Sequence, residues 1–179
     1  MIVFTKGRYE NKMADKKFPK DAMRVLKETS RTFYIPITFL EKELKHTVAS
    51  AYLVLRAIDE IEDHEALSND MKYNTLMQIS ELFKETFDED KYLQILAPVK
   101  NDMPEVTIRL GEWIDACPEH TRAVVLEASS EMAYGMAKWA KANWDIHTKA
   151  DLDDYTYYVA GLVGCLLYTS PSPRDKRQS

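Results

Sequence analysis

Hydrophobic and polar positions recur with helical spacing along much of the chain, and the segments that break this pattern are short. Glycine is scarce, with five residues, and the seven prolines stand at expected helix boundaries or near the C-terminus. Both features are typical of helices joined by short connections. The pattern therefore predicts an all-α fold.

Proline and capping residues mark the expected helix boundaries. Pro19 suits the first turn of a helix that runs to about Glu28, whereas Pro36 limits regular structure in the segment that follows. Ser68 and Asp151 are expected to be N-caps of two later helices. The expected helices cover residues of about 19–28, 41–64, 68–87, 90–97, 104–116 and 118–143, with a last helix that begins at 151.

The helix expected over about 41–64 carries an unusual polar stripe. At ~100° per residue, four of its polar residues, at spacings of four, three and four, fall within roughly 60° of one another and share one face. These residues are Tyr52, Arg56, Asp59 and Asp63. Apolar residues cover the rest of the circumference, whereas a surface helix shows the opposite balance. We therefore expect a helix that is buried on most sides.

Two carboxylates one turn apart on a mostly buried helix call for a positive partner. Asp59 and Asp63 repel each other, and the repulsion grows where water is excluded. A hard divalent cation such as Mg²⁺ prefers carboxylate oxygens and is commonly completed by substrate phosphates. Arg56 adds a fixed positive charge suited to bidentate phosphate contact. We hypothesise a metal and diphosphate site; the alternative is a solvated acidic face where the helix ends.

Composition and charge narrow the class of protein. A chain of 179 residues suits one domain, and 29 acidic against 24 basic residues give no sign of a nucleic-acid-binding surface. Cys117 and Cys165 lack metal-like spacing, so we expect ordinary thiols in a reducing, cytoplasmic compartment. No apolar run approaches the ~20 residues that a membrane span needs.

Three phrases of the sequence resemble one family. The stretch AYLVLRAIDEIEDH, residues 51–64, resembles the first aspartate-rich motif of the squalene/phytoene synthase family. SRTFY at 30–34 and YTYYVAGLVG at 155–164 resemble further family phrases in the expected order, and YGMAKWA at 134–140 is a looser match. Ordered motifs are more specific than any single one. The wording AGLVG looks more like squalene synthases than phytoene or dehydrosqualene synthases.

The resemblance implies an isoprenoid-synthase-type helical bundle around a central cavity. Its reaction would be the head-to-head condensation of two farnesyl diphosphates through presqualene diphosphate to squalene. Mg²⁺ would assist ionisation of the diphosphate, and NADPH would serve the reduction in a true squalene synthase. Phytoene or dehydrosqualene synthesis, which omits the reduction, is the alternative enzyme.

The resemblance also implies roles for individual residues. Asp59 and Asp63 would hold Mg²⁺, and Glu62 lies inside the same motif with a less defined part. Tyr155 would face the allylic carbocation as a third catalytic residue. The substrate-binding residues would be Ser30, Arg31, Tyr52 and Arg56 at the diphosphate. Phe33 would line the entrance to the prenyl pocket, and Val159 and Val163 would border the prenyl chains.

Some of these residues also have a purely structural explanation. Ser30 could cap the turn before FYIP, and Phe33 and Tyr52 could be core aromatics. A helical metal-binding or oxygen-handling protein would need paired E-x-x-H motifs, but that spacing occurs only at Glu43 and His46. A non-catalytic helical fragment is a further alternative.

Family members are longer and carry a second aspartate-rich motif on a later helix. No second D-x-x-x-D followed by an apolar helix is found after residue 164, so we expect an N-terminal fragment whose own turnover is in doubt. We expect a flexible N-terminal extension over 1–17 and a partial synthase domain over 18–168. Residues 169–179 should be a disordered or non-native tail, with a native flexible tail as the alternative.

The expected partner is farnesyl diphosphate, a small-molecule substrate, rather than nucleic acid. The expected product is a hydrocarbon that leaves into lipid, so peripheral membrane contact is compatible with a chain that has no transmembrane segment.

Overall fold

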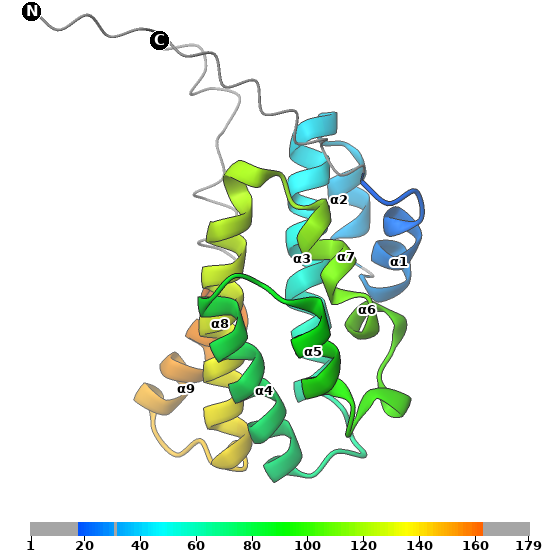
Figure 1. The fold of residues 1–179 in the computed structure, drawn as a ribbon. Coiled ribbons are helices and arrows are strands. Elements are labelled where there is room, and N and C mark those ends of the chain that lie inside the picture. The colour runs from blue at the N-terminus through cyan, green and yellow to red at the C-terminus, as the bar shows by residue number, and fades with distance from the viewer. Residues whose placement is uncertain (1–17, 31, 163–179) are drawn as a thin grey trace, which may run out of the picture.

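The computed structural model of the protein describes residues 18–30 and 32–162, and these residues are helical without a strand (Figure 1). This arrangement confirms the predicted all-α fold. The elements are α1 (Ala22–Thr29), α2 (Tyr34–Thr38), α3 (Lys42–Glu62), α4 (Asn69–Lys84), α5 (Glu89–Leu96), η1 (Lys100–Asp102), α6 (Glu105–Ile108), α7 (Leu110–Ala116), α8 (Glu119–Lys141), α9 (Lys149–Thr156) and the π-helical η2 (Tyr157–Gly161). The expected segments 1–17 and 169–179 lie outside the described residues.

Helix α3 lies at the centre of the bundle and packs against α1, α6, α7 and α8. Leu53, Ile58 and Ile61 on this helix are completely buried. The prediction of a long helix buried on most sides is therefore confirmed. The two long helices α3 and α8 run through the middle of the molecule, and α1 and α9 flank them on opposite sides (Figure 1).

Helices α4 and α8 are joined by a pair of serines. The Ser80 hydroxyl donates to the Ser130 carbonyl at 2.9 Å, and the Ser130 hydroxyl donates to the Ser80 carbonyl at 2.8 Å. Both side chains are buried, so this reciprocal pairing satisfies groups that would otherwise be costly to desolvate. Small side chains also let the two helices approach closely, which positions the C-terminal end of α8 beside the N-terminal end of α4.

Of two predicted N-caps, one is confirmed by the structure and the other is wrong. Ser68 caps α4 as predicted, since its Oγ accepts the Met71 N–H at 3.3 Å. The prediction that Asp151 caps the last helix is wrong. Thr148 is the N-cap, and its Oγ1 accepts the Asp151 N–H at 3.1 Å, while the Asp151 carboxylate accepts the Thr148 N–H at 2.8 Å. This capping box places the hydroxyl first and the acid three residues later.

Three other boundaries differ from the expectation. Pro36 lies within the short helix α2 rather than preventing it, because a first-turn residue needs no N–H for an intrahelical bond. The helix expected over 104–116 is divided at Arg109 into α6 and α7. Helix α4 ends at Lys84, three residues before the expected end at Phe87.

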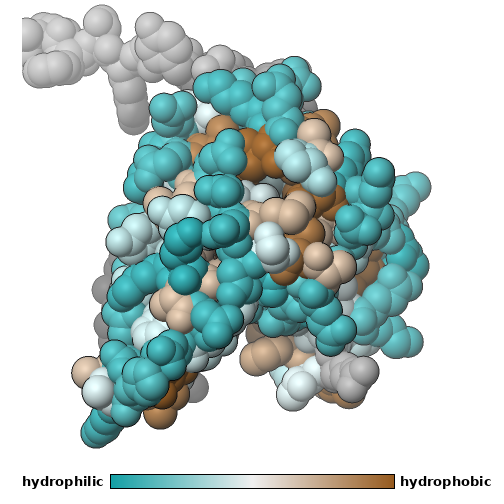
Figure 2. Space-filling view, turned by 90° about the horizontal axis from the view of Figure 1, so that it is seen from below, coloured by the Kyte–Doolittle hydropathy of each residue, from teal (hydrophilic) through white to brown (hydrophobic). Residues whose placement is uncertain are grey.

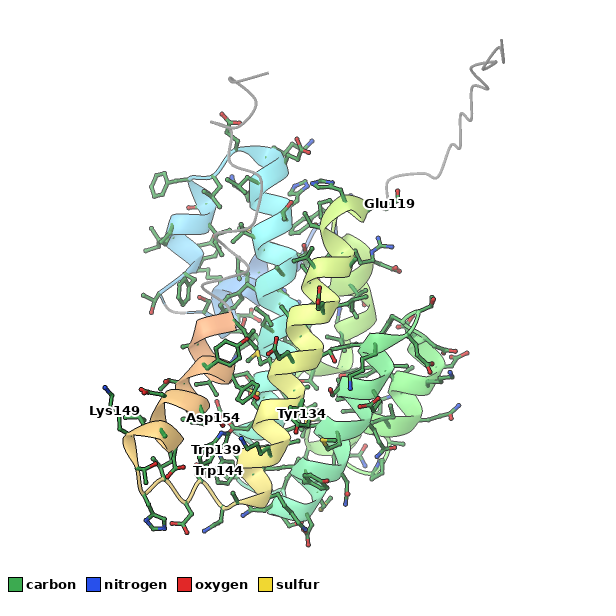
Figure 3. All side chains as sticks on the ribbon, turned by 90° about the vertical axis from the view of Figure 1, so that its left-hand side faces the viewer. Glu119, Tyr134, Trp139, Trp144, Lys149 and Asp154 are labelled. Atoms are coloured by element: carbon green, nitrogen blue, oxygen red, sulfur yellow. The ribbon has the colours of Figure 1, made fainter. Side chains whose placement is uncertain are left out.

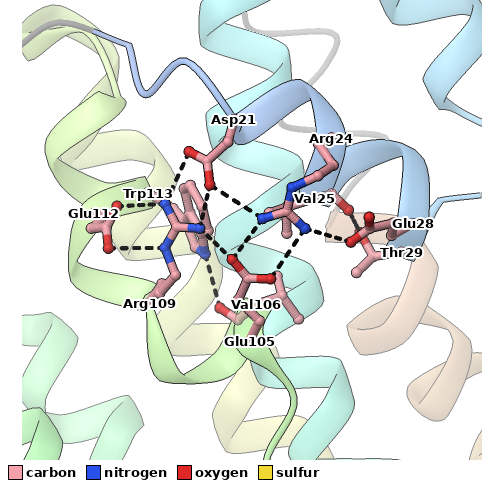
Figure 4. A network of polar contacts seen from close by, with 10 residues as sticks. All are labelled: Asp21, Arg24, Val25, Glu28, Thr29, Glu105, Val106, Arg109, Glu112 and Trp113. Carbon is pink, nitrogen blue, oxygen red and sulfur yellow. Dashed lines mark hydrogen bonds and ion pairs between the residues drawn. The ribbon is translucent and has the colours of Figure 1, made fainter.

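A network of charged residues fastens α1 to α6 and α7 (Figure 4). Arg109 donates to Asp21 and to Glu112, each at 2.7 Å, and also pairs with Glu105. Arg24 on α1 reaches Glu105 at 2.9 Å. The pairs Arg109–Asp21 and Arg24–Glu105 join residues more than 80 positions apart in the sequence, so they hold the N-terminal helix against the core.

The surface of the protein is mixed in character. Seen from below, hydrophilic residues cover most of the face, and hydrophobic residues gather in a smaller central area (Figure 2). No helix among residues 18–30 and 32–162 combines the length and apolar character needed to cross a bilayer.

We predict that the Asp21→Asn variant loses less stability in acid than the parent chain. The hydrogen bond from Arg109 lowers the pKa of Asp21 from 3.8 to about 2, so its stabilisation is complete above pH 3.8 and is lost as the pH falls through 2. An exposed ion pair contributes less than about 1 kcal/mol to the free energy of unfolding. When the pH is lowered from 3.8 to 2, the melting temperature of the parent chain should therefore fall about 2 °C more than that of the variant. Circular dichroism melts measure this difference, with Asp90→Asn on α5 as the matched control. An equal fall in parent and variant would contradict the assignment.

Candidate active site

The polar stripe of α3 forms one connected group of charges. The Arg56 guanidinium pairs with Asp59, lies 2.6 Å from Glu60 Oε1 and lies 3.7 Å from Asp63 Oδ2. Residues 56, 59 and 63 therefore share one face, as the helical spacing predicts. Arg56 supplies the positive charge that these carboxylates need while no cation is bound.

Three carboxylates at the C-terminal end of α3 converge. Asp59, Glu62 and Asp63 each offer an oxygen, and these atoms lie within 4.8 Å of one another. Glu62 is only 4% exposed, whereas 57% of the Asp63 side chain reaches solvent. The alternative of a uniformly solvated acidic face is therefore wrong at Glu62. The donor set, three carboxylates with one side open, suits Mg²⁺, which binds through a few carboxylates and keeps positions for water or phosphate.

Burial makes this carboxylate cluster electrostatically costly. Desolvation raises the pKa of Asp59, although the nearby Arg56 charge opposes this change. Desolvation also raises the pKa of Glu62 to about 7, against a hydrogen bond from Trp144 that favours the ionised form. The negative charge of Asp63 contributes to the increase in both pKa values. A divalent cation would offset this repulsion.

Tyr155 on α9 lies near enough to the same cluster to be influenced by its charge. Burial raises the pKa of the Tyr155 phenol, and the charges of Glu62, Asp63 and Asp59 raise it further. Its ring also meets the Trp139 ring edge to face, with centroids 5.8 Å apart. The structure therefore brings together the two motifs that are about 90 residues apart in the sequence.

Helix α9 is attached to α8 by specific contacts. Asp154 accepts hydrogen bonds from Lys138 at 2.8 Å and from the Trp139 indole at 2.9 Å (Figure 3). Gly135 lies directly under the Tyr158 ring, because a Cβ at this position would come within 2.0 Å of Tyr158 Cγ. These contacts hold α9 and η2 against α8.

The residues near the start of the chain that are predicted to bind substrate form a second group beside α3. Ser30 is buried and its Oγ accepts the Phe33 N–H at 3.0 Å, so it does cap the turn, and its hydroxyl proton can still be donated. The Phe33 ring is half exposed and lies 5.8 Å from the Tyr52 ring. The Tyr52 hydroxyl donates to the Thr29 carbonyl at 3.4 Å, which ties this turn to α3. Phe33 is therefore not a core aromatic.

The remaining predicted residues are less closely connected to the cluster. Val159 in η2 is partly buried and packs against the core. Arg31 and Val163 lie outside the described residues. A groove of about 660 Å³ between α4 and α8 is lined by residues such as Phe83, Leu126 and Tyr134, but by none of the predicted site residues.

One residue at the cluster was absent from the sequence-based prediction. The Trp144 indole N–H donates to Glu62 Oε1 at 2.6 Å from the turn between α8 and α9. Trp144 and its neighbour Asn143 have φ angles of 49° and 53°, a left-handed conformation that costs of order 1–3 kcal/mol per residue. The one signal in the sequence for a role of Trp144 is that this large aromatic residue stands between Asn143 and Asp145 in a polar connection.

Comparison with known proteins agrees with this arrangement. The squalene/phytoene synthase family model matches residues 26–178, and the chain belongs to this family. The squalene synthase of Rattus norvegicus is 31% identical over 150 residues, which cover 81% of this chain and 34% of the rat protein. That of Saccharomyces cerevisiae is 35% identical over 147 residues, which cover 78% of this chain and 32% of the yeast protein. The chain thus spans about a third of the length of these relatives.

A solved structure shares the fold. "The complex structure of TcSQS with ligand, BPH1237" superimposes with a TM-score of 0.63 at 27% identity, covering 82% of this chain and 42% of that chain. This similarity confirms the predicted isoprenoid-synthase-type helical fold.

We predict that Gly135→Ala destabilises the protein, because the added methyl group must displace the Tyr158 ring. The free energy of unfolding should fall by about 1–3 kcal/mol, despite the better helix propensity of alanine. The matched control is Gly111→Ala, whose Cβ would meet only the Glu89 side-chain carboxyl, at 2.9 Å, and that group can rotate away. Urea denaturation followed by circular dichroism compares the two. Equal stabilities would show that Tyr158 is not held on Gly135.

Proposed function

We propose that this protein carries the diphosphate-binding and metal-binding part of a squalene synthase. The reaction would condense two farnesyl diphosphates head to head, through presqualene diphosphate, to squalene. The observation that carries the proposal is the convergence of Asp59, Glu62 and Asp63 at the end of α3, near Tyr155 on α9. The chain that carries this cluster is a member of the squalene/phytoene synthase family. The squalene synthases among its relatives support the choice of product.

The carboxylates of α3 would hold Mg²⁺. Asp59 and Asp63 would be its ligands, with Glu62 as a third, since the three offer oxygens within 4.8 Å of one another. When bound, Mg²⁺ would neutralise charge that develops on the leaving diphosphate. With Asp59 and Asp63 engaged in this way, the Arg56 guanidinium would keep Glu60 as a partner, and its remaining N–H groups could donate to diphosphate oxygens.

Further residues would bind the rest of the substrate. Ser30, Arg31 and Tyr52 would contact the diphosphate from the turn beside α3. Phe33, Val159 and Val163 would border the prenyl chains and exclude water, which would otherwise quench an allylic carbocation. The Tyr155 phenol would stabilise positive charge through its ring face or move a proton at its oxygen. NADPH would supply the hydride for the final reduction, and no described residue is assigned to it.

We predict that farnesyl diphosphate analogues bind only in the presence of Mg²⁺. An analogue with a sulfur bridge to the diphosphate does not ionise readily, so calorimetry can measure its binding without turnover. Asp59→Asn and Asp63→Asn should each weaken binding by about tenfold or more, equivalent to about 1.4 kcal/mol, because each removes a charged metal ligand.

The matched control is Asp70→Asn on α4. Asp70 is exposed and pairs with Lys141 at 2.5 Å, outside the carboxylate cluster. Binding that persists without Mg²⁺, or that is equally strong in all three variants, would contradict the proposal. Product analysis with and without NADPH distinguishes squalene synthesis from phytoene or dehydrosqualene synthesis.

A further inference from the structure

Glu62 is held by a residue from a different part of the chain. It stands in the last turn of α3 and is 4% exposed, yet its carboxylate accepts the indole N–H of Trp144 at 2.6 Å. Trp144 follows α8, 82 positions later in the sequence. The bond therefore joins the acidic end of α3 to the turn that leads into α9, near Trp139 and Asp154 (Figure 3).

The turn that carries Trp144 has an uncommon conformation. Asn143 and Trp144 have φ angles of 53° and 49°, and among the described residues no other non-glycine residue has a positive φ. Asparagine tolerates the left-handed region, but a bulky residue such as tryptophan is a rare occupant. Such a conformation persists only where surrounding contacts enforce it, and it is enriched at functional sites.

Those contacts come from the first turns of α4. The Asn69 amide donates to Asn143 Oδ1 at 2.9 Å, and the Lys72 ammonium lies 5.0 Å from the centre of the Trp144 ring. Lys72 is itself buried, at 7% exposure, so this cation is directed at the ring rather than at solvent. The Trp144 ring is thus held from α4, independently of its bond to Glu62.

We infer that Trp144 is a positioning residue that fixes Glu62 as the third carboxylate ligand of the metal, an inference that rests on the proposed function. A carboxylate has about four lone-pair positions, so accepting one indole N–H at Oε1 leaves the others available toward Asp59 and Asp63. A neutral donor also stabilises the ionised form of Glu62 without competing as a cation would.

The test compares two indole-to-carboxylate hydrogen bonds. Trp144→Phe keeps an aromatic ring but removes the donor to Glu62, and Trp139→Phe removes the equivalent donor to Asp154, which lies outside the cluster. Titration with Mn²⁺, followed by the electron paramagnetic resonance of the free ion, should give about tenfold weaker binding in Trp144→Phe and unchanged binding in Trp139→Phe.

A double-mutant cycle identifies the route of the effect. If Trp144 acts through Glu62, Trp144→Phe should not weaken Mn²⁺ binding further in a Glu62→Gln background. Full additivity would instead assign the loss to general distortion of the turn. Circular dichroism melts of each variant record any loss of stability separately.

Indole fluorescence provides a readout that needs no change at Trp144. The Trp139→Phe variant keeps two indoles, Trp144 and the fully buried Trp113. Mg²⁺ binding at Glu62 should therefore shift the emission of Trp144. Adding Glu62→Gln to this variant should abolish the shift. This measurement tests the link between Trp144 and metal binding at Glu62 even if Trp144→Phe does not fold.

The outcomes separate the two levels of the hypothesis. Absence of Mn²⁺ binding by the parent chain would overturn the proposed function itself. Normal binding by the parent and by Trp144→Phe, or a fluorescence that does not respond to Mg²⁺, would leave the proposed function intact and overturn the positioning role of Trp144.

Discussion

The repulsion among carboxylates at the C-terminal end of α3 is the constraint on which the site depends. Asp59, Glu62 and Asp63 converge where water reaches them only in part, and desolvation raises the pKa of Asp59 and of Glu62. Such a group persists only with compensation from its neighbours. Arg56 offsets part of the charge from one side, and Trp144 donates a hydrogen bond from the other. Asp63 remains accessible to a ligand, because 57% of its side chain reaches solvent although Arg56 lies 3.7 Å away.

The rest of the bundle can be understood as support for this arrangement. The serine pair between α4 and α8 sets the close approach of these helices, and the same two helices meet at the strained turn that presents Trp144. Gly135 lets the Tyr158 ring pack directly on α8, so that Tyr155 lies near the carboxylates. Backbone strain, a close glycine contact and a desolvated acidic group therefore occur together, as is common at functional sites.

Much of the fold could be predicted because it depends on local rules. The 3.6-residue period placed Arg56, Asp59 and Asp63 on one face, and the hydroxyl of Ser68 indicated a helix start. One error was also local, because two residues suited the same position. Thr148 and Asp151 both suit an N-cap, and only the reciprocal bonds of the capping box assign the roles. The break at Arg109 had no local signal, because it accompanies ion pairs to Asp21, far away in the sequence.

Periodicity and motif order are properties of neighbouring residues. They were therefore enough to predict the helical class, the mostly buried helix α3, its ionisable stripe and the family resemblance. The folded arrangement was needed to show that Glu62 is buried while Asp63 is exposed, that Tyr155 lies near the carboxylates, and that Trp144 bonds to Glu62. These features depend on how α3, α4, α8 and α9 pack against one another. The burial and desolvation of an individual polar side chain arise from residues distant in the chain, so the helical pattern that predicts a buried helix does not show which of its carboxylates is buried.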